Sequence, residues 1–267
     1  MMKRYYLLIF FILTMCVTAR ADDAFKPEFY AFYNGIPPMS YDDEAIMLKE
    51  LGYDGISQIY GGGDELVKRV NAYKKQGLKV LSVYLAASEK PINADVVKAL
   101  EDGGMIELTV KNITPEVIES IRNTAEMAAQ LNIRVALYPH HGNAVATMPQ
   151  AIDLVEKVNH PNLGIMFNLC HFLKNEKAED LERVLGKAAP YLFSVSTCGA
   201  DLNGKDWNTL IQPLDKGTFP QKRLFATLKN LNFNGPVGLQ CYAVKGDKHT
   251  NLKNSIEAWK TILNELQ

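Results

Sequence analysis

The stretch MIELTVKNITPEVIESIRNTAEMAAQLNIRVALYPHHG, residues 105–142, carries the clearest structural signal in the chain. It begins with a strand-like run at 105–111 and ends with a second one at 134–142. Between them, 114–132 is predicted to be a helix, with Thr114 as the N-cap and Pro115 as the first helical residue. The stretch therefore predicts a strand–helix–strand unit.

The same alternation continues along the chain after residue 28. The other predicted strands cover 29–35, 55–60, 78–86, 163–172, 191–201 and 236–244. The other predicted helices cover 41–52, 64–77, about 94–101, 147–158, about 176–188, 220–231 and 248–266. Alternation of this kind favours right-handed βαβ crossovers and a parallel sheet. Eight units in roughly 245 residues match the size of a single α/β (β/α)₈ TIM barrel.

A doubly wound open sheet is the alternative fold. Such a sheet usually has a glycine-rich phosphate loop after its first strand, and YNGIPPMS at 33–40 is not one. The glycines of YGGGDE at 60–65 lack the Lys-Ser/Thr frame of a phosphate loop, and we interpret them as a tight turn. The barrel is therefore the preferred prediction.

The first residues have the features of a secretory signal peptide. A basic start precedes an apolar run over 5–17, and an Ala-x-Ala site ends at Ala21. We expect cleavage to remove 1–21 and to leave 22–267 as an exported, periplasmic barrel domain. A run of about 13 apolar residues is too short to span a bilayer easily, so we expect no stable membrane span. A lipid anchor through Cys16 is the alternative.

Composition narrows the expected partners. With 29 basic and 30 acidic side chains, the formal net charge is −1, which gives no electrostatic reason to expect nucleic acid or an anionic membrane. The partner expected is a small molecule. Cys170, Cys198 and Cys241 follow the signal peptide, and an odd number leaves at least one thiol free. We expect free, partly buried thiols, with a disulfide as the alternative.

The candidate chemistry lies where the predicted strands end, because barrel enzymes place their reactive groups at the carboxyl ends of the strands. Polar or sulfur-containing side chains at these ends are Asn34, Gln58, Tyr60, Tyr84, Thr109, Lys111, Tyr138, His140, His141, Asn168, Cys170, His171, Ser196, Cys198, Gln240, Tyr242 and Lys245. Three of the five histidines of the chain fall in this set. We expect at least one of them to be functional.

Strand alternation assigns Gln240, Tyr138 and Glu107 to the inside of the barrel, with Tyr138 on the face that Ala136 and His140 share. Gln240 shares a face with Gly238, opposite the apolar Leu239, and Glu107 lies opposite Ile106 and Leu108. An inward carboxylate is costly unless it is hydrogen-bonded, and its pKa is raised by burial. Two roles stay open for Glu107, a structural hydrogen bond to a neighbouring strand or catalysis as an acid or base.

The order of these polar groups resembles the xylose isomerase-like TIM barrels of the sugar isomerase/epimerase superfamily, over the whole chain after the signal peptide. Such barrels typically carry Glu on strand 5, Asp-x-x-His on strand 6, His on strand 7 and Glu on strand 8. These ligands hold a divalent metal ion, and the two Glu residues shuttle a proton. The matching residues in YPHHG, FNLCH, FSVSTC and GLQCY are Tyr138, Asn168, Ser196 and Gln240, while His171 matches the histidine that contacts substrate.

The resemblance therefore implies a site whose metal ligands are all replaced. Amide, hydroxyl and phenol groups carry no negative charge and bind Mg²⁺ or Mn²⁺ poorly. A divalent metal is doubtful, although a shifted zinc site remains open. Its ligands would be His140 and His171 with Cys170, Cys198 or Glu107.

The implied activity is proton removal beside the carbonyl of a keto- or 3-keto-sugar, by an isomerase, an epimerase or a 3-keto-glycoside lyase. The predicted catalytic residues are His140 and His171 as acid and base, Lys111 beside an enolate oxygen, and Glu107. The predicted sugar-binding residues are Tyr138, Asn168, Ser196, Gln240, Tyr242, Lys245, Gln58 and Tyr84, with Lys245 also able to serve beside the enolate. A carbohydrate-binding barrel without catalysis is the alternative.

Overall fold

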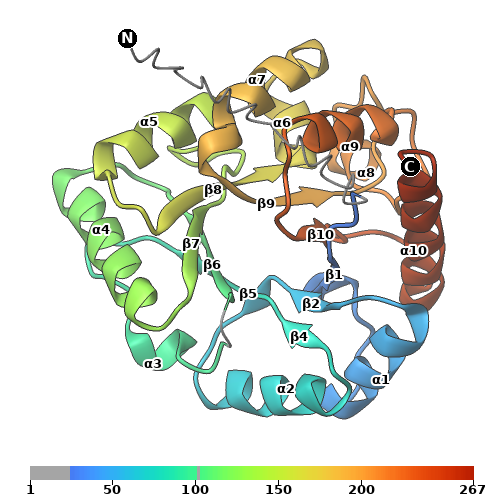
Figure 1. The fold of residues 1–267 in the computed structure, drawn as a ribbon, viewed down its shortest axis with the longest axis horizontal. Coiled ribbons are helices and arrows are strands. Elements are labelled where there is room, and N and C mark those ends of the chain that lie inside the picture. Colours follow the sequence, from blue (N-terminus) through green and yellow to red (C-terminus); the bar gives the residue numbers. More distant parts are fainter. Residues whose placement is uncertain (1–24, 101–102) are drawn as a thin grey trace, which may run out of the picture.

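The computed structural model describes residues 25–100 and 103–267, so the predicted signal peptide lies outside the described residues. Within them, ten strands pair in parallel in the order β3-β5-β6-β7-β8-β9-β10-β1-β2-β4 (Figure 1). The strands are β1 (Phe29–Phe32), β2 (Gly55–Ser57), β3 (Ile59–Tyr60), β4 (Lys79–Val80), β5 (Ser82–Ala86), β6 (Met105–Thr109), β7 (Arg134–Leu137), β8 (Leu163–Asn168), β9 (Leu192–Thr197) and β10 (Val237–Leu239).

Two interrupted strands explain why ten are observed where eight were predicted. Gln58 separates β2 from β3, and Leu81 separates β4 from β5. Each half keeps its own partner, because β2 pairs with β4 and β3 pairs with β5. Leu81 bridges the gap, since its N–H donates to Ile56 at 2.8 Å and its carbonyl accepts from Met105 at 2.8 Å. The sheet therefore closes on itself, and the predicted barrel is confirmed.

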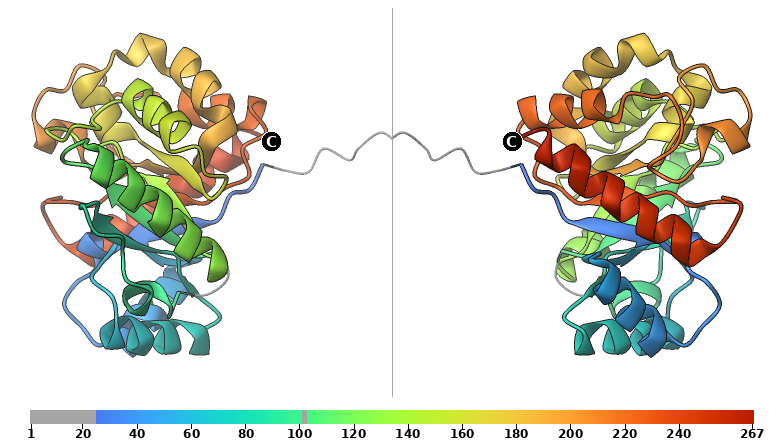
Figure 2. Two further views of the ribbon diagram at one scale, coloured as in Figure 1. Left: turned by 90° about the vertical axis from the view of Figure 1, so that its left-hand side faces the viewer. Right: turned by 90° about the vertical axis from the view of Figure 1, so that its right-hand side faces the viewer.

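Helices surround this sheet (Figure 1). They are α1 (Tyr41–Leu51), α2 (Asp64–Lys75), α3 (Ala94–Val97), α4 (Pro115–Gln130), α5 (Met148–Val158), α6 (Leu169–Asn175), α7 (Leu181–Ala188), α8 (Trp207–Leu210), α9 (Gln221–Asn230) and α10 (Lys248–Asn264). Figure 2 shows the long helices α4 and α10 running along opposite outer walls. Among the described helices, none combines the length and apolar character needed to cross a membrane.

Local sequence signals set these boundaries. Thr114 caps α4 as predicted, because its side chain accepts the N–H of Val117 at 3.2 Å. The prediction of a strand over 163–172 was wrong at its end. The side chain of Asn168 accepts the N–H of His171, so α6 begins at once after β8. His171 therefore lies on a helix.

The core has two parts. The larger part lies between the sheet and the helices and contains the outward faces of the strands. The smaller part fills the barrel interior with Phe32, Met105, Ala136, Tyr138 and Met166. Ala136 of β7 and Tyr138 directly after it both belong to this interior part, so Tyr138 points toward the barrel axis as alternation predicts.

Candidate active site

A cavity of about 420 Å³ opens where the strands end, at the face predicted from the sequence. It is lined by Asn34, Gln58, Tyr60, Tyr84, Tyr138, His140, His141, His171, Trp207, Ile211, Gln240 and Tyr242. Seven of the twelve predicted site residues are among them. None of the described lining residues is Lys, Arg, Asp or Glu.

The hydroxyl of Tyr138 lies at the centre of a network of amides. The Asn168 side chain donates to it through Nδ2, and the Gln240 side chain donates through Nε2 at 3.2 Å. Asn168 is buried and is not among the residues that line the cavity. Asn168 and Gln240, both predicted to bind the sugar, thus hydrogen-bond to the same hydroxyl. Of the three residues, Tyr138 and Gln240 line the cavity.

Backbone and thiol donors fix the orientation of both amides. Oδ1 of Asn168 accepts the thiol of Cys170 at 3.0 Å and the N–H of His171 at 3.4 Å. Oε1 of Gln240 accepts the N–H of Tyr242 at 2.9 Å. Because each amide oxygen is held by these donors, each NH₂ group must face the Tyr138 hydroxyl.

The two predicted catalytic histidines lie side by side, with ring centroids 4.2 Å apart. Nδ1 of His140 lies 2.8 Å from the carbonyl oxygen of His141, so it must carry a proton. Nδ1 of His171 accepts the N–H of His141 at 3.2 Å, so its proton resides on Nε2. The two rings therefore present opposite functions, with Nε2 of His140 an acceptor and Nε2 of His171 a donor.

Burial keeps both imidazoles neutral. Burial lowers the pKa of His140 below its ordinary value of 6.5; the hydrogen bond to the His141 carbonyl opposes this shift, while the electrostatic effects of the His141 ring and Lys111 add to it. Burial, with the neighbouring His140 and His141, lowers the pKa of His171 to about 3. Near pH 7 the cavity thus holds one neutral base and one neutral donor.

Glu107 faces inward as predicted and lies outside the cavity lining. It accepts the hydroxyl of Ser82 at 2.5 Å and Nε2 of Gln58 at 3.2 Å. Burial raises its pKa to about 7, although these hydrogen bonds act in the opposite direction. The structural bond to a neighbouring strand is therefore present, and Glu107 meets the cavity through Gln58.

Besides Glu107 and Asn168, three further predicted site residues lie away from the cavity wall. Lys111 and Lys245 lie in loops beyond β6 and β10, and both side chains are exposed. Neither is among the residues that line the cavity. Ser196 is fully buried, and its hydroxyl has no hydrogen-bond partner among the described residues.

Sequence reasoning missed Trp207 and Ile211 as part of the wall. Both belong to the segment inserted between β9 and α9, where α8 brings them over the strand ends. The Trp207 ring lies 5.3 Å from the ring of His171 and 5.8 Å from that of His141. One feature of the sequence could have suggested this role for Trp207: it is a tryptophan in an insertion that follows a strand end, on the face where barrel enzymes bind their ligands.

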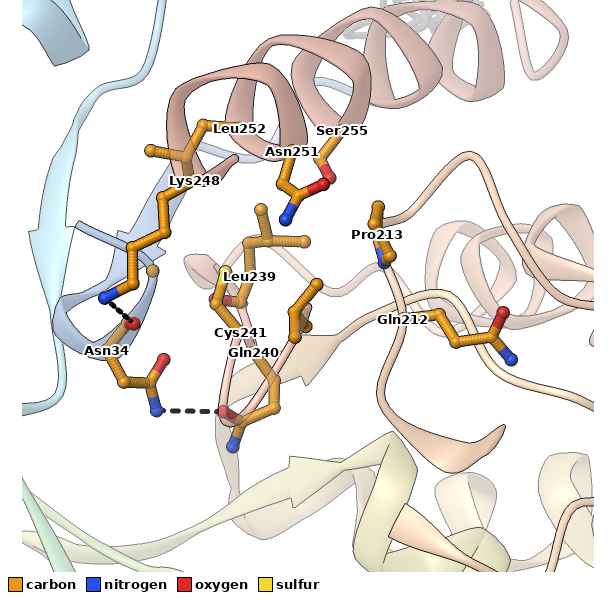
Figure 3. A pocket seen from close by; sticks show the side chains of 12 residues that line it. Asn34, Gln212, Pro213, Leu239, Gln240, Cys241, Lys248, Asn251, Leu252 and Ser255 are labelled. Carbon is orange, nitrogen blue, oxygen red and sulfur yellow. Dashed lines mark hydrogen bonds between the residues drawn. The ribbon is translucent and has the colours of Figure 1, made fainter. Parts of the chain in front are cut away.

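A small pocket of about 10 Å³ adjoins the cavity and shares Asn34 and Gln240 with it. Figure 3 shows Asn34 between Lys248 and Gln240. Nζ of Lys248 donates to the carbonyl oxygens of Asn34 and Ile36, both at 2.9 Å, and Nδ2 of Asn34 donates to Gln240 at 3.2 Å. The start of α10 therefore holds the segment after β1, which in turn supports Gln240.

Residues 109–262 match the family described as xylose isomerase-like TIM barrel. The chain belongs to this family. A probable ketose 3-epimerase of Synechocystis is 24% identical over 149 residues, which are 54% of this chain and 46% of that protein. The xylose isomerase-like barrel thus aligns with about half the length of this curated relative.

Solved structures share the fold of this xylose isomerase-like barrel. The 3-keto-D-glucoside 4-epimerase of E. coli is 18% identical, with a TM-score of 0.69 over 88% of this chain and 100% of that one. The D-psicose 3-epimerase of Clostridium cellulolyticum H10 with D-tagatose is 15% identical, with a TM-score of 0.65 over 90% and 99%. At this identity the likeness concerns the fold alone.

A divalent metal does not fit the four positions that the resemblance assigns to its ligands. No negative charge is supplied by Tyr138, Asn168, Ser196 and Gln240. Both amide groups direct their N–H bonds toward the Tyr138 hydroxyl, so they present donors where a cation needs acceptors. The shifted zinc site finds no support either. In residues 25–100 and 103–267, no three His, Cys, Asp or Glu side chains gather as a metal ion requires.

The three thiols lie apart from the cavity wall. Cys170, Cys198 and Cys241 are free in the structure, as expected. Cys170 and Cys198 pack together with Leu210 and Ile211, and the Cys198 thiol donates to the carbonyl of Leu210 at 3.2 Å. Contact with Cys170 and burial raise the pKa of Cys198 well above its ordinary value, so this thiol stays protonated.

Proposed function

We propose that this protein is a sugar-active enzyme that removes a proton beside the carbonyl of a keto- or 3-keto-sugar. The observation that supports this most directly is the pair of neutral imidazoles with opposite functions at Nε2. A neutral imidazole with a lowered pKa is available as a base near pH 7. His140 can therefore do the work for which related barrels use a carboxylate.

In the proposed reaction, Nε2 of His140 takes a proton from the carbon next to the carbonyl. The electron pair of that C–H bond forms a C=C bond, and the carbonyl π pair moves onto oxygen to give an enolate. A proton delivered from solvent to the opposite face gives the epimer, and the proton held by His140 is then released to solvent. A proton returned to the neighbouring carbon, after transfer between the two oxygens, gives the isomer. Loss of a leaving group from the next carbon, as an alcohol that takes the proton held by His140, gives the lyase outcome instead.

The substrate class that fits the cavity is a neutral sugar. The described lining has no cationic side chain that could pair with a phosphate or carboxylate group. Aromatic rings of Tyr60, Tyr84 and Trp207 offer apolar faces to the C–H groups of a sugar, while Gln58 and Gln240 offer hydrogen bonds to its hydroxyls. The names of the relatives, a probable ketose 3-epimerase and a 3-keto-D-glucoside 4-epimerase, support this class.

A second candidate function is sugar binding without catalysis. The observation that favours it is the lack of any carboxylate in the described cavity wall. Aromatic faces and amides suffice for binding, and the buried Glu107 reaches the cavity only through Gln58. The neutral base at His140 favours the enzyme, because binding alone needs no free lone pair beside a fixed donor.

Solvent-deuterium exchange tests the proposal without knowledge of the product. The purified protein is incubated in D₂O with D-fructose, D-tagatose, D-psicose and a methyl 3-keto-glucoside, and deuterium at carbons beside the carbonyl is followed by NMR. We expect exchange with at least one sugar, and loss of at least 100-fold in His140→Ala. His249→Ala, at an exposed position on α10, is the matched control and should keep the full rate.

Two outcomes reject the enzyme. The first is no exchange with any of these sugars, and the second is an undiminished rate in His140→Ala. If the wild-type protein nevertheless binds a sugar in calorimetry, and His140→Ala binds it equally well, the sugar-binding function is the better account.

A further inference from the structure

We infer that the Tyr138 hydroxyl donates a hydrogen bond to the carbonyl oxygen of the ligand, and so does without a metal ion what a bound cation would do. This inference rests on the proposed function only for the identity of the ligand. Its structural basis is the direction in which the phenol proton can point.

Both lone pairs of the Tyr138 oxygen are already used. One accepts Nδ2 of Asn168 and the other accepts Nε2 of Gln240, and neither amide can turn over without losing the bonds to its oxygen. The phenol proton must therefore leave this network. Tyr138 is among the residues that line the cavity, although only 1% of its surface is exposed, and Gln58 is a neighbouring side chain that competes with a ligand oxygen for the proton.

The proton stays on Tyr138 throughout the physiological range. Burial raises the pKa of Tyr138 well above its ordinary value, and the nearby Cys170 and Glu107 act in the same direction. The hydroxyl is thus a neutral donor that does not ionise in place of its ligand. In an enclosed site a fixed donor of this kind acts with little reorganisation.

The donor stands where negative charge would form. When His140 takes the proton from carbon, the carbonyl π pair moves onto the ligand oxygen, and the phenol of Tyr138 stabilises that oxygen without giving up its proton. The rings of His171 and Tyr138 are roughly perpendicular, with centroids 5.7 Å apart, and both residues line the cavity. A fixed neutral donor at Tyr138 can then stabilise the oxygen with little reorganisation.

Tyr138→Phe is the direct test, since it keeps the ring and removes only the hydroxyl. The rate of deuterium exchange should fall about 10²- to 10³-fold, as for loss of one oxyanion donor. Tyr191→Phe is the matched control, because Tyr191 donates its hydroxyl to Glu156 at 3.0 Å away from the cavity wall. Wild-type protein treated with a chelator should keep its full rate, and added Mn²⁺ or Zn²⁺ should not raise it.

A spectroscopic readout separates this inference from the proposed function. A methyl 3-keto-glucoside labelled with ¹³C at its carbonyl is bound to each protein, and the C=O stretch is measured by infrared difference spectroscopy. The wild-type protein should shift the band to lower wavenumber, and Tyr138→Phe should lose most of that shift. A shifted band without deuterium exchange would support Tyr138 as the donor and reject the enzyme.

A second variant guards against a folding defect in Tyr138→Phe, which leaves two N–H groups without an acceptor. Asn168→Asp keeps the shape of the side chain and replaces its donor by a carboxylate. At pH 8, with metal ions removed by a chelator, this carboxylate should accept the Tyr138 proton and draw it away from the ligand. The band measured with this variant should return toward the unbound position with the hydroxyl still present. Three results overturn the inference: an equal band shift in wild type and Tyr138→Phe, activity that depends on added metal, or failure of the wild type to bind the probe.

Discussion

The backbone of His141 sets the protons of both His140 and His171. Its carbonyl accepts Nδ1–H of His140 at 2.8 Å, and its N–H donates to Nδ1 of His171 at 3.2 Å. One residue between two strand ends thus makes one imidazole an acceptor and the other a donor at Nε2. This arrangement uses main-chain atoms, so substitution of the His141 side chain leaves it in place.

The pH dependence of deuterium exchange follows from the state of His140. Its pKa is lowered from 6.5, and only the neutral form accepts a proton, so the rate should rise with pH through a value below 6.5 and level off before pH 7. Protonation of His171, with a pKa of about 3, should not affect this range. A pH–rate profile checks this, and an inflection above pH 7 would contradict the assignment of His140 as the base.

Glu107 should make the protein less stable as the pH rises toward neutrality. Its pKa is raised from 4.5 to about 7 on folding, so the proton binds more tightly to the folded state. The stabilisation linked to this proton is complete below pH 4.5 and is lost as the pH rises through about 7, with a size of roughly 3 kcal/mol.

Glu107→Gln isolates this effect from that of other carboxylates. Relative to wild type, the free energy required to unfold this variant in urea should be larger at pH 8 than at pH 5. A difference between the two proteins that does not change with pH would show that Glu107 is not titrating in this range.

Ser196→Ala should stabilise the protein by about 1 kcal/mol, since the buried hydroxyl has no partner among the described residues. Ser82→Ala is the informative contrast, because the Ser82 hydroxyl bonds Glu107 and its loss should destabilise the fold. Thermal unfolding compares the two variants. Sugar affinity should be unchanged in Ser196→Ala, and a clear loss would mean that the serine reaches the ligand after all.

Trp207 should report ligand binding. It packs against His171 at the cavity wall, whereas the other tryptophan, Trp259, is buried against Phe29 and Phe225. Sugar titration should therefore change the emission of the wild-type protein. Trp207→Phe should abolish that change and weaken affinity about 5- to 10-fold, as expected for about 1 kcal/mol of aromatic contact. An unaltered response in the variant would place the ligand elsewhere.

Processing of the N-terminus remains a prediction from the sequence. Expression of the full chain in a bacterium with a secretion pathway should give a periplasmic protein whose first residue is Asp22. Mass spectrometry of the purified protein measures this directly. Cys16→Ala should not alter the product, and dependence of membrane attachment on Cys16 would favour the lipid anchor.

The fold could be predicted from the sequence because eight strand–helix units repeat one pattern, and strand alternation sufficed to turn Glu107 and Tyr138 inward. The limits of α6 were missed, since Asn168 ends a strand and caps a helix at the same residue. Trp207 could not be placed, because its position depends on how an insertion folds over distant strand ends. Lys111 and Lys245 were expected near the ligand, but only the course of their loops determines where such long side chains point.

The absence of formal charge from the described cavity wall has a consequence for how ligands arrive. A charged site attracts its substrate over distances of about a Debye length, and added salt weakens that attraction. The described wall of the cavity carries no formal charge of its own, and a neutral sugar has no charge that would respond to the field of outlying groups such as Lys111. Capture then depends on diffusion and shape, so the association rate should be the same in dilute buffer and in concentrated salt.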